Sequence, residues 1–181
     1  SPVTTTERVH IRAALGRVLA EDVISPLDVP SHDNSAMDGY AVRFADLKSD
    51  GKATLKVAGT AFAGVPFPDA VEPGECVRIM TGAVVPQGAD TIVMQEHVEA
   101  KGDEVTIGGG HRQGQHVRRA GEDLKTGQSA LKRGQFLRPA EIGLIASLGI
   151  PEIMVYRRLR VAFFSTGDEL KSVGTPLAEG Q

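Results

Sequence analysis

Polar and apolar residues alternate along much of the chain with the spacing of short β-strands. Residues Arg8 to Arg12 show this alternation, which is typical of a half-buried strand. The stretches 97–99 and 104–107 flank Lys101-Gly102-Asp103 and predict a hairpin. Further strands are predicted at 22–25, 54–57, 76–80, 91–95, 153–156 and 160–164. The segment from Gly59 to Pro68 is rich in Gly and Pro and is predicted to be a loop.

Helical spacing is found in two places. Apolar residues between 13 and 20 fall on one helical face, although Gly16 weakens this predicted helix. A second helix is predicted over 140–148, with Pro139 at its first position and Gly149 just past its end. No helix is predicted from 43 to 120, where short strands and Gly- and Pro-rich turns indicate a small barrel or curled sheet.

These elements predict an α+β fold that is rich in β-strands. We expect an elongated α+β domain made of residues 1–24 and 121–156, with a β-barrel-like domain of residues 25–120 inserted into it. Residues 157–181 are expected to begin a truncated α/β, Rossmann-like domain, because the apolar strand 160–164 runs into a polar loop. The chain lacks an initiator Met and ends within a loop, so we expect a fragment.

Composition excludes several classes of function. The 181 residues carry a net charge of −3, and aromatic residues are only 4% of the chain, so we expect no nucleic-acid binding. The single cysteine, Cys76, can form neither an internal disulfide nor a Cys-based zinc site, and we expect it to be buried in a strand. No apolar run of about 18 residues is present, so no membrane span is expected. A secretory signal is not evident either, and we expect a cytoplasmic protein.

Four loops place an oxygen-bearing side chain beside glycine, at a strand end or in a sharp turn. Carboxylates and a hydroxyl without paired His or Cys suit a hard cation such as Mg²⁺. The adjacent glycines let backbone N–H groups approach an anion, and Arg118 and Arg119 can clamp an oxyanion. The loops are Met37-Asp38-Gly39, Met80-Thr81-Gly82, Gly121-Glu122-Asp123 and Thr166-Gly167-Asp168-Glu169. Among the histidines, only His32 lies in the turn-rich stretch that contains the first of these loops, residues 30–42.

Each loop also has a plainer interpretation. Asp38 can be part of an ordinary surface turn, and Thr81 can cap one. Asp123 can form a surface ion pair with Arg118 or Arg119. Glu169 can cap a following helix together with Thr166. From the residues alone, the prediction is therefore a site for Mg²⁺ and an anionic ligand, without a named reaction.

Six stretches together resemble the molybdopterin molybdenumtransferase family, the molybdenum insertases that include the E domain of gephyrin. They occur in the family's order, with compatible spacing, over nearly the whole chain. The stretches are Ser25-Pro26-Leu27-Asp28-Val29-Pro30, Asp33-Asn34-Ser35-Ala36-Met37-Asp38-Gly39-Tyr40-Ala41, Arg78-Ile79-Met80-Thr81-Gly82-Ala83, Val93-Met94-Gln95-Glu96, Arg118-Arg119-Ala120-Gly121-Glu122-Asp123 and Phe164-Ser165-Thr166-Gly167-Asp168-Glu169-Leu170.

The resemblance implies Mg²⁺-dependent insertion of molybdate into adenylylated molybdopterin, with release of AMP. It also implies a homodimer whose active cleft lies between domains of the two subunits, with molybdopterin adenylyltransferase as the upstream partner. Carried over by position, the catalytic residues are Asp38, Thr81, Asp123 and Glu169. The residues implied to bind the cofactor are Ser35, Gly82, Arg118, Arg119, Thr166 and Gly167, and those implied to bind the metal are Asp168 and Glu169.

One departure limits what this chain is expected to do. The family's chain continues well past Gln181, so we expect the present chain to be inactive by itself. Two alternatives stay open: a non-enzymatic scaffold like gephyrin, and an anion- or nucleotide-binding module without turnover. A peptide-binding groove would favour the first alternative. Binding of AMP and Mg²⁺ without product on addition of molybdate would favour the second.

Overall fold

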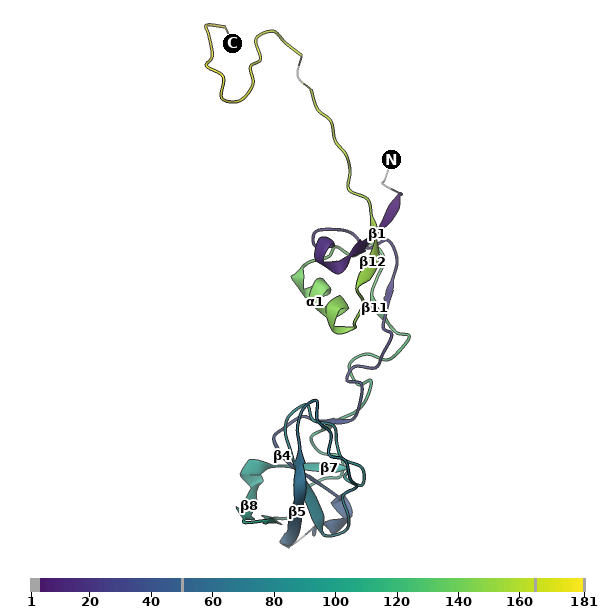
Figure 1. The fold of residues 1–181 in the computed structure, drawn as a ribbon, viewed down its shortest axis with the longest axis vertical. Helices are drawn as coiled ribbons and strands as arrows, with labels where there is room; N and C mark the ends of the chain where they lie inside the picture. The colour runs from purple at the N-terminus through teal and green to yellow at the C-terminus, as the bar shows by residue number, and fades with distance from the viewer. Residues whose placement is uncertain (1–3, 50, 165, 181) are drawn as a thin grey trace. The chain divides into compact units, whose positions relative to one another are not determined.

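The chain forms two compact units in the computed structural model, which describes residues 4–49, 51–164 and 166–180. Unit 1 combines Ser1–Glu21 with Arg133–Gln181, and unit 2 is Asp22–Lys132. Figure 1 shows the course of the chain through both units. The domain boundaries predicted from the sequence, including the insertion at 25–120, stay predictions.

Unit 1 is built on one pair of antiparallel strands and one α-helix. Strand β1 (Thr6–His10) pairs with β12 (Glu152–Tyr156), and the helix α1 (Pro139–Ser147) lies beside them (Figure 1). The strands predicted at 8–12 and 153–156 and the helix predicted at 140–148 are thus confirmed within a few residues. The buried apolar residues of this unit are Ala14, Leu19, Leu137, Ile145, Leu148, Ile153 and Val155.

The helix predicted over 13–20 is wrong. A single 3₁₀ turn, η1 (Ile11–Ala13), is followed by an irregular extended segment. The N–H of Gly16 donates to the carbonyl of Leu137 at 2.9 Å, and that of Leu19 donates to Gln135 at 3.0 Å. Gly16 adopts a positive φ of 74°, which a helix does not allow. Pairing with a distant segment therefore satisfies the backbone groups that a helix would have used.

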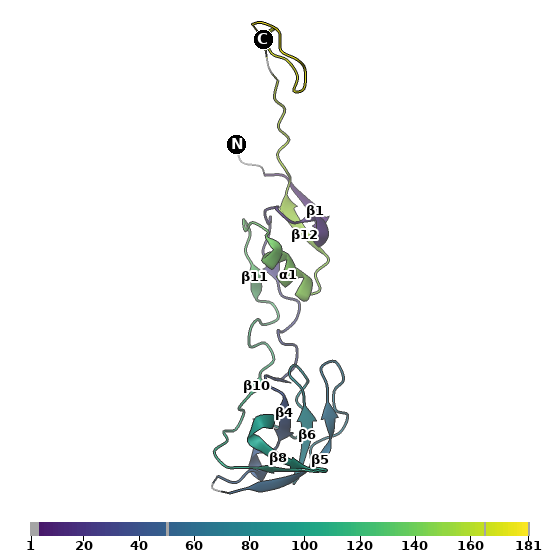
Figure 2. The same ribbon diagram turned by 90° about the vertical axis from the view of Figure 1, so that its left-hand side faces the viewer.

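Unit 2 contains a curled six-stranded sheet with the order β7-β4-β6-β5-β9-β8, part of which is seen in Figure 2. All neighbours in it are antiparallel except β5 and β6, which run parallel. The curled sheet predicted for this region is confirmed. Its strands are β4 (Gly39–Val42), β5 (Ala53–Ala61), β6 (Glu75–Ile79), β7 (Thr91–Met94), β8 (Val98–Lys101) and β9 (Glu104–Ile107). Strand β5 continues to Ala61, so the loop predicted from Gly59 begins too early.

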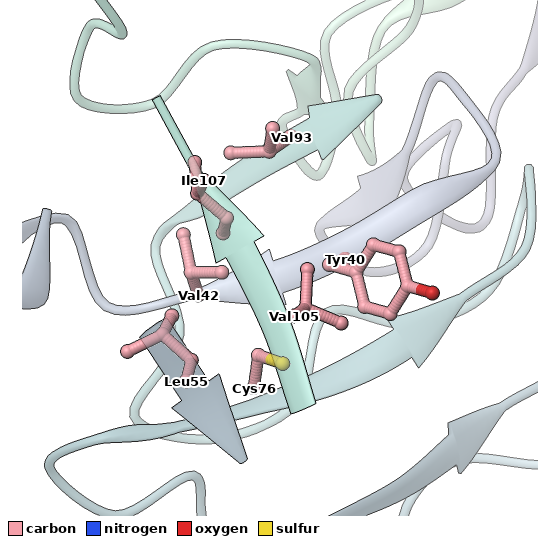
Figure 3. Packing of buried hydrophobic residues seen from close by; sticks show 7 residues of the cluster. All are labelled: Tyr40, Val42, Leu55, Cys76, Val93, Val105 and Ile107. Carbon is pink, nitrogen blue, oxygen red and sulfur yellow. The ribbon is translucent and has the colours of Figure 1, made fainter. Parts of the chain in front are cut away.

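Both faces of this sheet are covered by apolar side chains. Along β4, Tyr40 and Val42 join one cluster and Ala41 joins the other, as the alternation of a strand requires. Figure 3 shows the first cluster, in which Cys76 is fully buried. The expectation of a buried cysteine in a strand is thus confirmed. This burial raises the pKa of the Cys76 thiol to about 12.

The rest of unit 2 contains short elements that tie distant segments together. Strand β2 (Val23–Ile24) pairs with β11 (Ser129–Leu131), and β3 (Asn34–Ser35) pairs with β10 (Val117–Arg118). The 3₁₀ turns η2 (Phe44–Asp46) and η3 (Gln95–His97) complete the unit. Between residues 43 and 120, the described residues contain these 3₁₀ turns but no α-helix, in agreement with the sequence prediction.

Residues 157–164 and 166–180 contain neither helix nor strand (Figure 1). The strand predicted at 160–164 is therefore wrong, and the Rossmann-like start is not confirmed. Phe163 and Phe164 are 92% and 87% exposed, so the coverage on both faces that is typical of an apolar strand is absent among the described residues. Ser165 lies outside the described residues. Among the described residues, no helix has the length and apolar character needed to cross a membrane.

Candidate functional site

Asp38 and Thr81 form the best-defined polar pair among the predicted site residues. One oxygen of Asp38, Oδ1, accepts hydrogen bonds from both the backbone N–H and the hydroxyl of Thr81, each at 2.7 Å. The two residues are 43 positions apart, and both side chains are exposed. The second carboxylate oxygen of Asp38 is therefore left to face solvent or a ligand.

Two local features fix this pair in place. Asp38 directly precedes β4, whose first residue, Gly39, packs so tightly that an added Cβ would lie 2.1 Å from the carbonyl oxygen of Val93. Thr81 lies in a turn closed by a 2.9 Å hydrogen bond from Ala83 N–H to the Met80 carbonyl. Gly82 in this turn has a φ of 79°, which is why glycine is suited to the position. Thr81 thus belongs to a turn as well as to the pair.

The pair keeps its carboxylate ionised. Hydrogen bonds from the Thr81 backbone and hydroxyl lower the pKa of Asp38, and the positive charge of Arg78 lowers it further. Arg78 lies on β6 directly opposite Tyr40 of β4. An exposed, negatively charged Asp38 can accept hydrogen bonds from a ligand or contribute to binding a cation.

Ser35 and Gly82 lie next to this pair. Gly82 N–H donates to the Ser35 carbonyl at 2.8 Å, which joins the Thr81 turn to β3. The Ser35 side chain is buried, and its hydroxyl donates to the Met37 carbonyl at 2.5 Å. Ser35 therefore shapes the loop that presents Asp38, and its hydroxyl is already engaged within the protein.

Arg118 and Asp123 form an ion pair at the end of β10. The Arg118 guanidinium donates to Asp123 Oδ2 at 2.6 Å, and it also lies 3.6 Å from a carboxylate oxygen of Glu122. The side chains of Arg118 and Asp123 are 39% and 53% exposed. The surface ion pair is thus present, and it leaves both charged groups accessible.

Arg119 is held by a residue that was not predicted to belong to the site. Its guanidinium donates to Asp33 Oδ2 at 2.6 Å, and Ala120 N–H donates to Asp33 Oδ1 at 2.8 Å. The Ala120 hydrogen bond and the Arg119 charge lower the pKa of Asp33. The Asp33 carboxylate thus binds a segment 86 residues away.

A sequence signal for Asp33 exists in the regular spacing of three aspartates. Asp28, Asp33 and Asp38 follow one another at intervals of five residues, and we call them the aspartate series. Asp28 Oδ1 accepts from the backbone N–H and hydroxyl of Thr126 at 2.7 and 3.0 Å, as Asp38 does from Thr81. Each carboxylate of the series therefore ties the segment 28–38 to a later part of the chain.

The loop Thr166-Gly167-Asp168-Glu169 is presented differently. All four residues are exposed and lie in unit 1. The Glu169 carboxylate folds over Gly167, where an added Cβ would lie 2.4 Å from Glu169 Oε1. No helix follows this loop in residues 170–180, so the predicted helix cap by Glu169 is absent there.

The chain thus presents its predicted site residues in two groups. Hydrogen bonds and strand pairing connect the group in unit 2, which consists of Ser35, Asp38, Thr81, Gly82, Arg118, Arg119 and Asp123. The group in unit 1 consists of Thr166, Gly167, Asp168 and Glu169. Within the described residues, no three His, Cys, Asp or Glu side chains lie close enough together to hold a metal ion. His32 is exposed and contacts the Ser31 hydroxyl at 3.0 Å.

The comparison with family models matches one family. Residues 1–149 match the model described as "MoeA N-terminal region (domain I and II)". Curated relatives agree along nearly the whole chain. The molybdopterin molybdenumtransferase of Haemophilus influenzae is 49% identical over 179 residues, which is 98% of this chain and 44% of that protein. The molybdopterin molybdenumtransferase of a Nostoc species is 43% identical over 97% of this chain and 41% of that protein.

Solved structures give the same result. A crystal structure described as molybdopterin biosynthesis MoeA protein from Pyrococcus horikoshii matches with a TM-score of 0.85 and 36% identity. The match covers 98% of this chain and 46% of that one. The chain therefore spans less than half the length of the relatives it matches.

Proposed function

The chain belongs to the MoeA family, whose N-terminal region it carries, and on this premise we propose that it serves molybdate insertion into adenylylated molybdopterin. In this reaction AMP leaves and the molybdenum cofactor remains on the dithiolene. The observation that supports the proposal most is the hydrogen-bonded pair of Asp38 and Thr81, which is exposed at the start of β4. The pairing of β3 with β10 connects its loop to the segment that carries the Arg118–Asp123 ion pair. The complete enzyme is a molybdopterin molybdenumtransferase, and it acts in molybdenum cofactor biosynthesis.

The unit 2 residues orient the substrate in this proposal. Asp38 uses its free carboxylate oxygen to accept a hydrogen bond from the pterin part, while Thr81 holds that carboxylate in a fixed direction. Arg118 and Arg119 bind the phosphate oxygens, since a guanidinium pairs with phosphate in a forked geometry. Asp123 and Asp33 set the directions of these two guanidinium groups.

The donor set of the unit 1 loop fits Mg²⁺. Asp168 and Glu169 are exposed carboxylates, and neither forms an ion pair within residues 166–180. Mg²⁺ in phosphate-transferring sites is held by one or two carboxylates, with water and substrate phosphate completing the shell. Asp168 and Glu169 would hold the ion where its positive charge would offset that of the substrate phosphate during cleavage of the phosphoanhydride. Thr166 and Gly167 would direct a hydroxyl and an N–H to the same phosphate.

A complete site would need more than this chain. We propose a cytoplasmic homodimer in which unit 2 of one subunit faces the cofactor-binding part of its partner. Its adenylylated substrate would come from molybdopterin adenylyltransferase. Since the chain spans 44% of the Haemophilus relative, the remaining part would supply further pterin and molybdate contacts. The present chain alone would therefore release no AMP.

The test compares two aspartates of the aspartate series in the complete protein. Asp38→Ala and Asp28→Ala each remove a carboxylate that accepts an N–H and a hydroxyl from one threonine. Only Asp38 belongs to the proposed site. The rate of AMP release on addition of molybdate is expected to fall by about 100-fold or more in Asp38→Ala, because this variant loses a group that orients the substrate. Asp28→Ala is expected to stay within about threefold of the parent enzyme.

Two further variants extend the same assay. Asp123→Ala and Glu169→Ala remove one proposed group from each unit, and both are expected to lose most of the molybdate-dependent AMP release. Thermal unfolding of each variant shows whether the fold persists. Parental turnover in both variants would overturn the proposed function.

A further inference from the structure

A recess in unit 1 is lined by none of the residues assigned to the transfer reaction. Its volume is about 300 Å³, and Arg17, Val18, Tyr156, Arg157, Arg158 and Leu159 contribute to its walls. Three of these residues are arginines, and no acidic residue lines the recess. An arginine-rich wall with no lining carboxylate selects for negatively charged ligands.

Arg17 is the buried part of this recess. Its side chain is only 8% exposed, and its Nη2 donates to a Glu7 carboxylate oxygen and, at 2.8 Å, to the Tyr156 carbonyl. A guanidinium carries five N–H donors, and Nη2 supplies only two of them. In the described residues no fully buried side-chain nitrogen lacks a partner. The donors on Nε and Nη1, which form no hydrogen bond among the described residues, are therefore not fully buried, and Arg17 lines the recess.

The walls around Arg17 are fixed by backbone hydrogen bonds. Tyr156 N–H donates to the Val18 carbonyl at 2.9 Å, and Arg157 N–H donates to the Thr5 carbonyl at 3.0 Å. The Tyr156 hydroxyl accepts a 2.8 Å hydrogen bond from Arg133 Nε, whose guanidinium carbon lies 5.8 Å from the ring centre. The wall formed by Val18, Tyr156 and Arg157 is thus preformed, which reduces the entropy lost when a ligand binds.

Charge also favours an anion here. Unit 1 has nine Lys and Arg against seven Asp and Glu, a net charge of +2, although the whole chain has −3. Arg157 and Arg158 are exposed and have no ion-pair partner among the residues that the structure describes. Their charges are therefore available to a ligand.

We propose that this recess binds a phosphate group, either as inorganic phosphate or as a small phosphate monoester. Arg17 donates from the buried wall, and Arg157 and Arg158 donate from the rim. Val18, Leu159 and the Tyr156 ring offer apolar surface for the organic part of a monoester. This site is independent of the proposed transfer reaction and uses none of its residues.

The experiment is calorimetric titration of the complete protein with inorganic phosphate and, separately, with phenyl phosphate at low ionic strength. Neither compound is a substrate or product of the proposed transfer. One site per chain is expected, with phenyl phosphate binding more tightly than phosphate if a monoester is preferred. The variant Arg157→Ala/Arg158→Ala removes only exposed side chains and is expected to weaken binding by about tenfold or more.

A matched control separates a site from general charge. Arg8→Ala/Arg12→Ala removes two exposed arginines of the same unit that do not line the recess, and it is expected to change affinity less than about threefold. Arg17→Lys keeps the positive charge but loses the forked N–H donors of the guanidinium, so phosphate binding is expected to weaken. The midpoint of thermal unfolding shows whether this variant is still folded. Equal losses in the two double variants would overturn the proposal. An absence of saturable binding to the parent protein would overturn it as well. Molybdate-dependent AMP release is expected to be unchanged in the Arg157→Ala/Arg158→Ala variant.

Discussion

At the scale of single residues, the aspartate series shows that one arrangement of atoms serves two purposes. Asp28 with Thr126 and Asp38 with Thr81 have the same donors and acceptor, but only Asp38 and Thr81 are among the residues predicted to form the site. Hydrogen bonding alone therefore does not identify a functional carboxylate. The sequence placed Asp38 and Thr81 in turns, but it could not pair two residues 43 positions apart without knowing the sheet register.

The aspartate series predicts a loss of stability in acid. Hydrogen bonds lower the pKa of Asp28, Asp33 and Asp38 in the folded chain below the unfolded value of about 3.9. Their contribution is fully present above that unfolded pKa and is lost as the pH falls through the lowered folded values. The urea concentration at the unfolding midpoint is therefore expected to decrease as the pH is lowered below about 4. This decrease is expected to be less steep in Asp33→Asn. An unchanged pH profile in this variant would contradict the assignment.

Gly39 predicts a steric cost at the start of β4. A Cβ at this position would lie 2.1 Å from the Val93 carbonyl oxygen, so β4 and the edge strand β7 must separate in Gly39→Ala. The free energy of unfolding is expected to fall by about 3 kcal/mol, as in strongly overpacked cores. Gly108→Ala is the control, because an added Cβ there meets nothing within 4 Å. Urea denaturation measures both variants, and equal stability of the two would refute the close approach.

At the scale of elements, local signals succeeded where they agreed with the tertiary pairing. Pro139 and Gly149 bracket a helix that the structure contains, and the hairpin around Gly102 is present as β8 and β9. The spacing at 13–20 favoured a helix equally well, yet contacts to Leu137 and Gln135 draw this segment into an extended form. Periodicity records which side chains are buried and does not record which backbone segment lies alongside.

The helix α1 predicts a pH dependence of its own. Two Arg138 donors, the guanidinium and the backbone N–H, lower the pKa of Glu141 to about 2. This contribution to stability is fully present above the unfolded pKa of about 4.3 and is lost as the pH falls towards 2. The thermal midpoint of Glu141→Gln is thus expected to lie below that of the parent at pH 6 and to approach it near pH 2. Glu152→Gln, at an exposed position, is the control. A constant difference across this pH range would contradict the pairing.

At the scale of the whole molecule, the proposed site draws on both compact units. The sequence motifs identified residues in unit 2 and in unit 1, and the structure describes each group by itself. The relatives are more than twice as long as this chain, and Phe163 and Phe164 are exposed here. Contacts between distant segments are long-range, so local patterns in the sequence do not predict them.

The most direct measurement mixes two inactive variants of the complete protein, Asp38→Ala and Glu169→Ala, after confirming by light scattering that each is a dimer. If unit 2 of one subunit acts with the Glu169 loop of the other, a mixed dimer contains one intact site. Random exchange of subunits is then expected to restore molybdate-dependent AMP release to about a quarter of the parental rate. A mixture no more active than its two components, with exchange of subunits verified, would contradict a site shared between two copies.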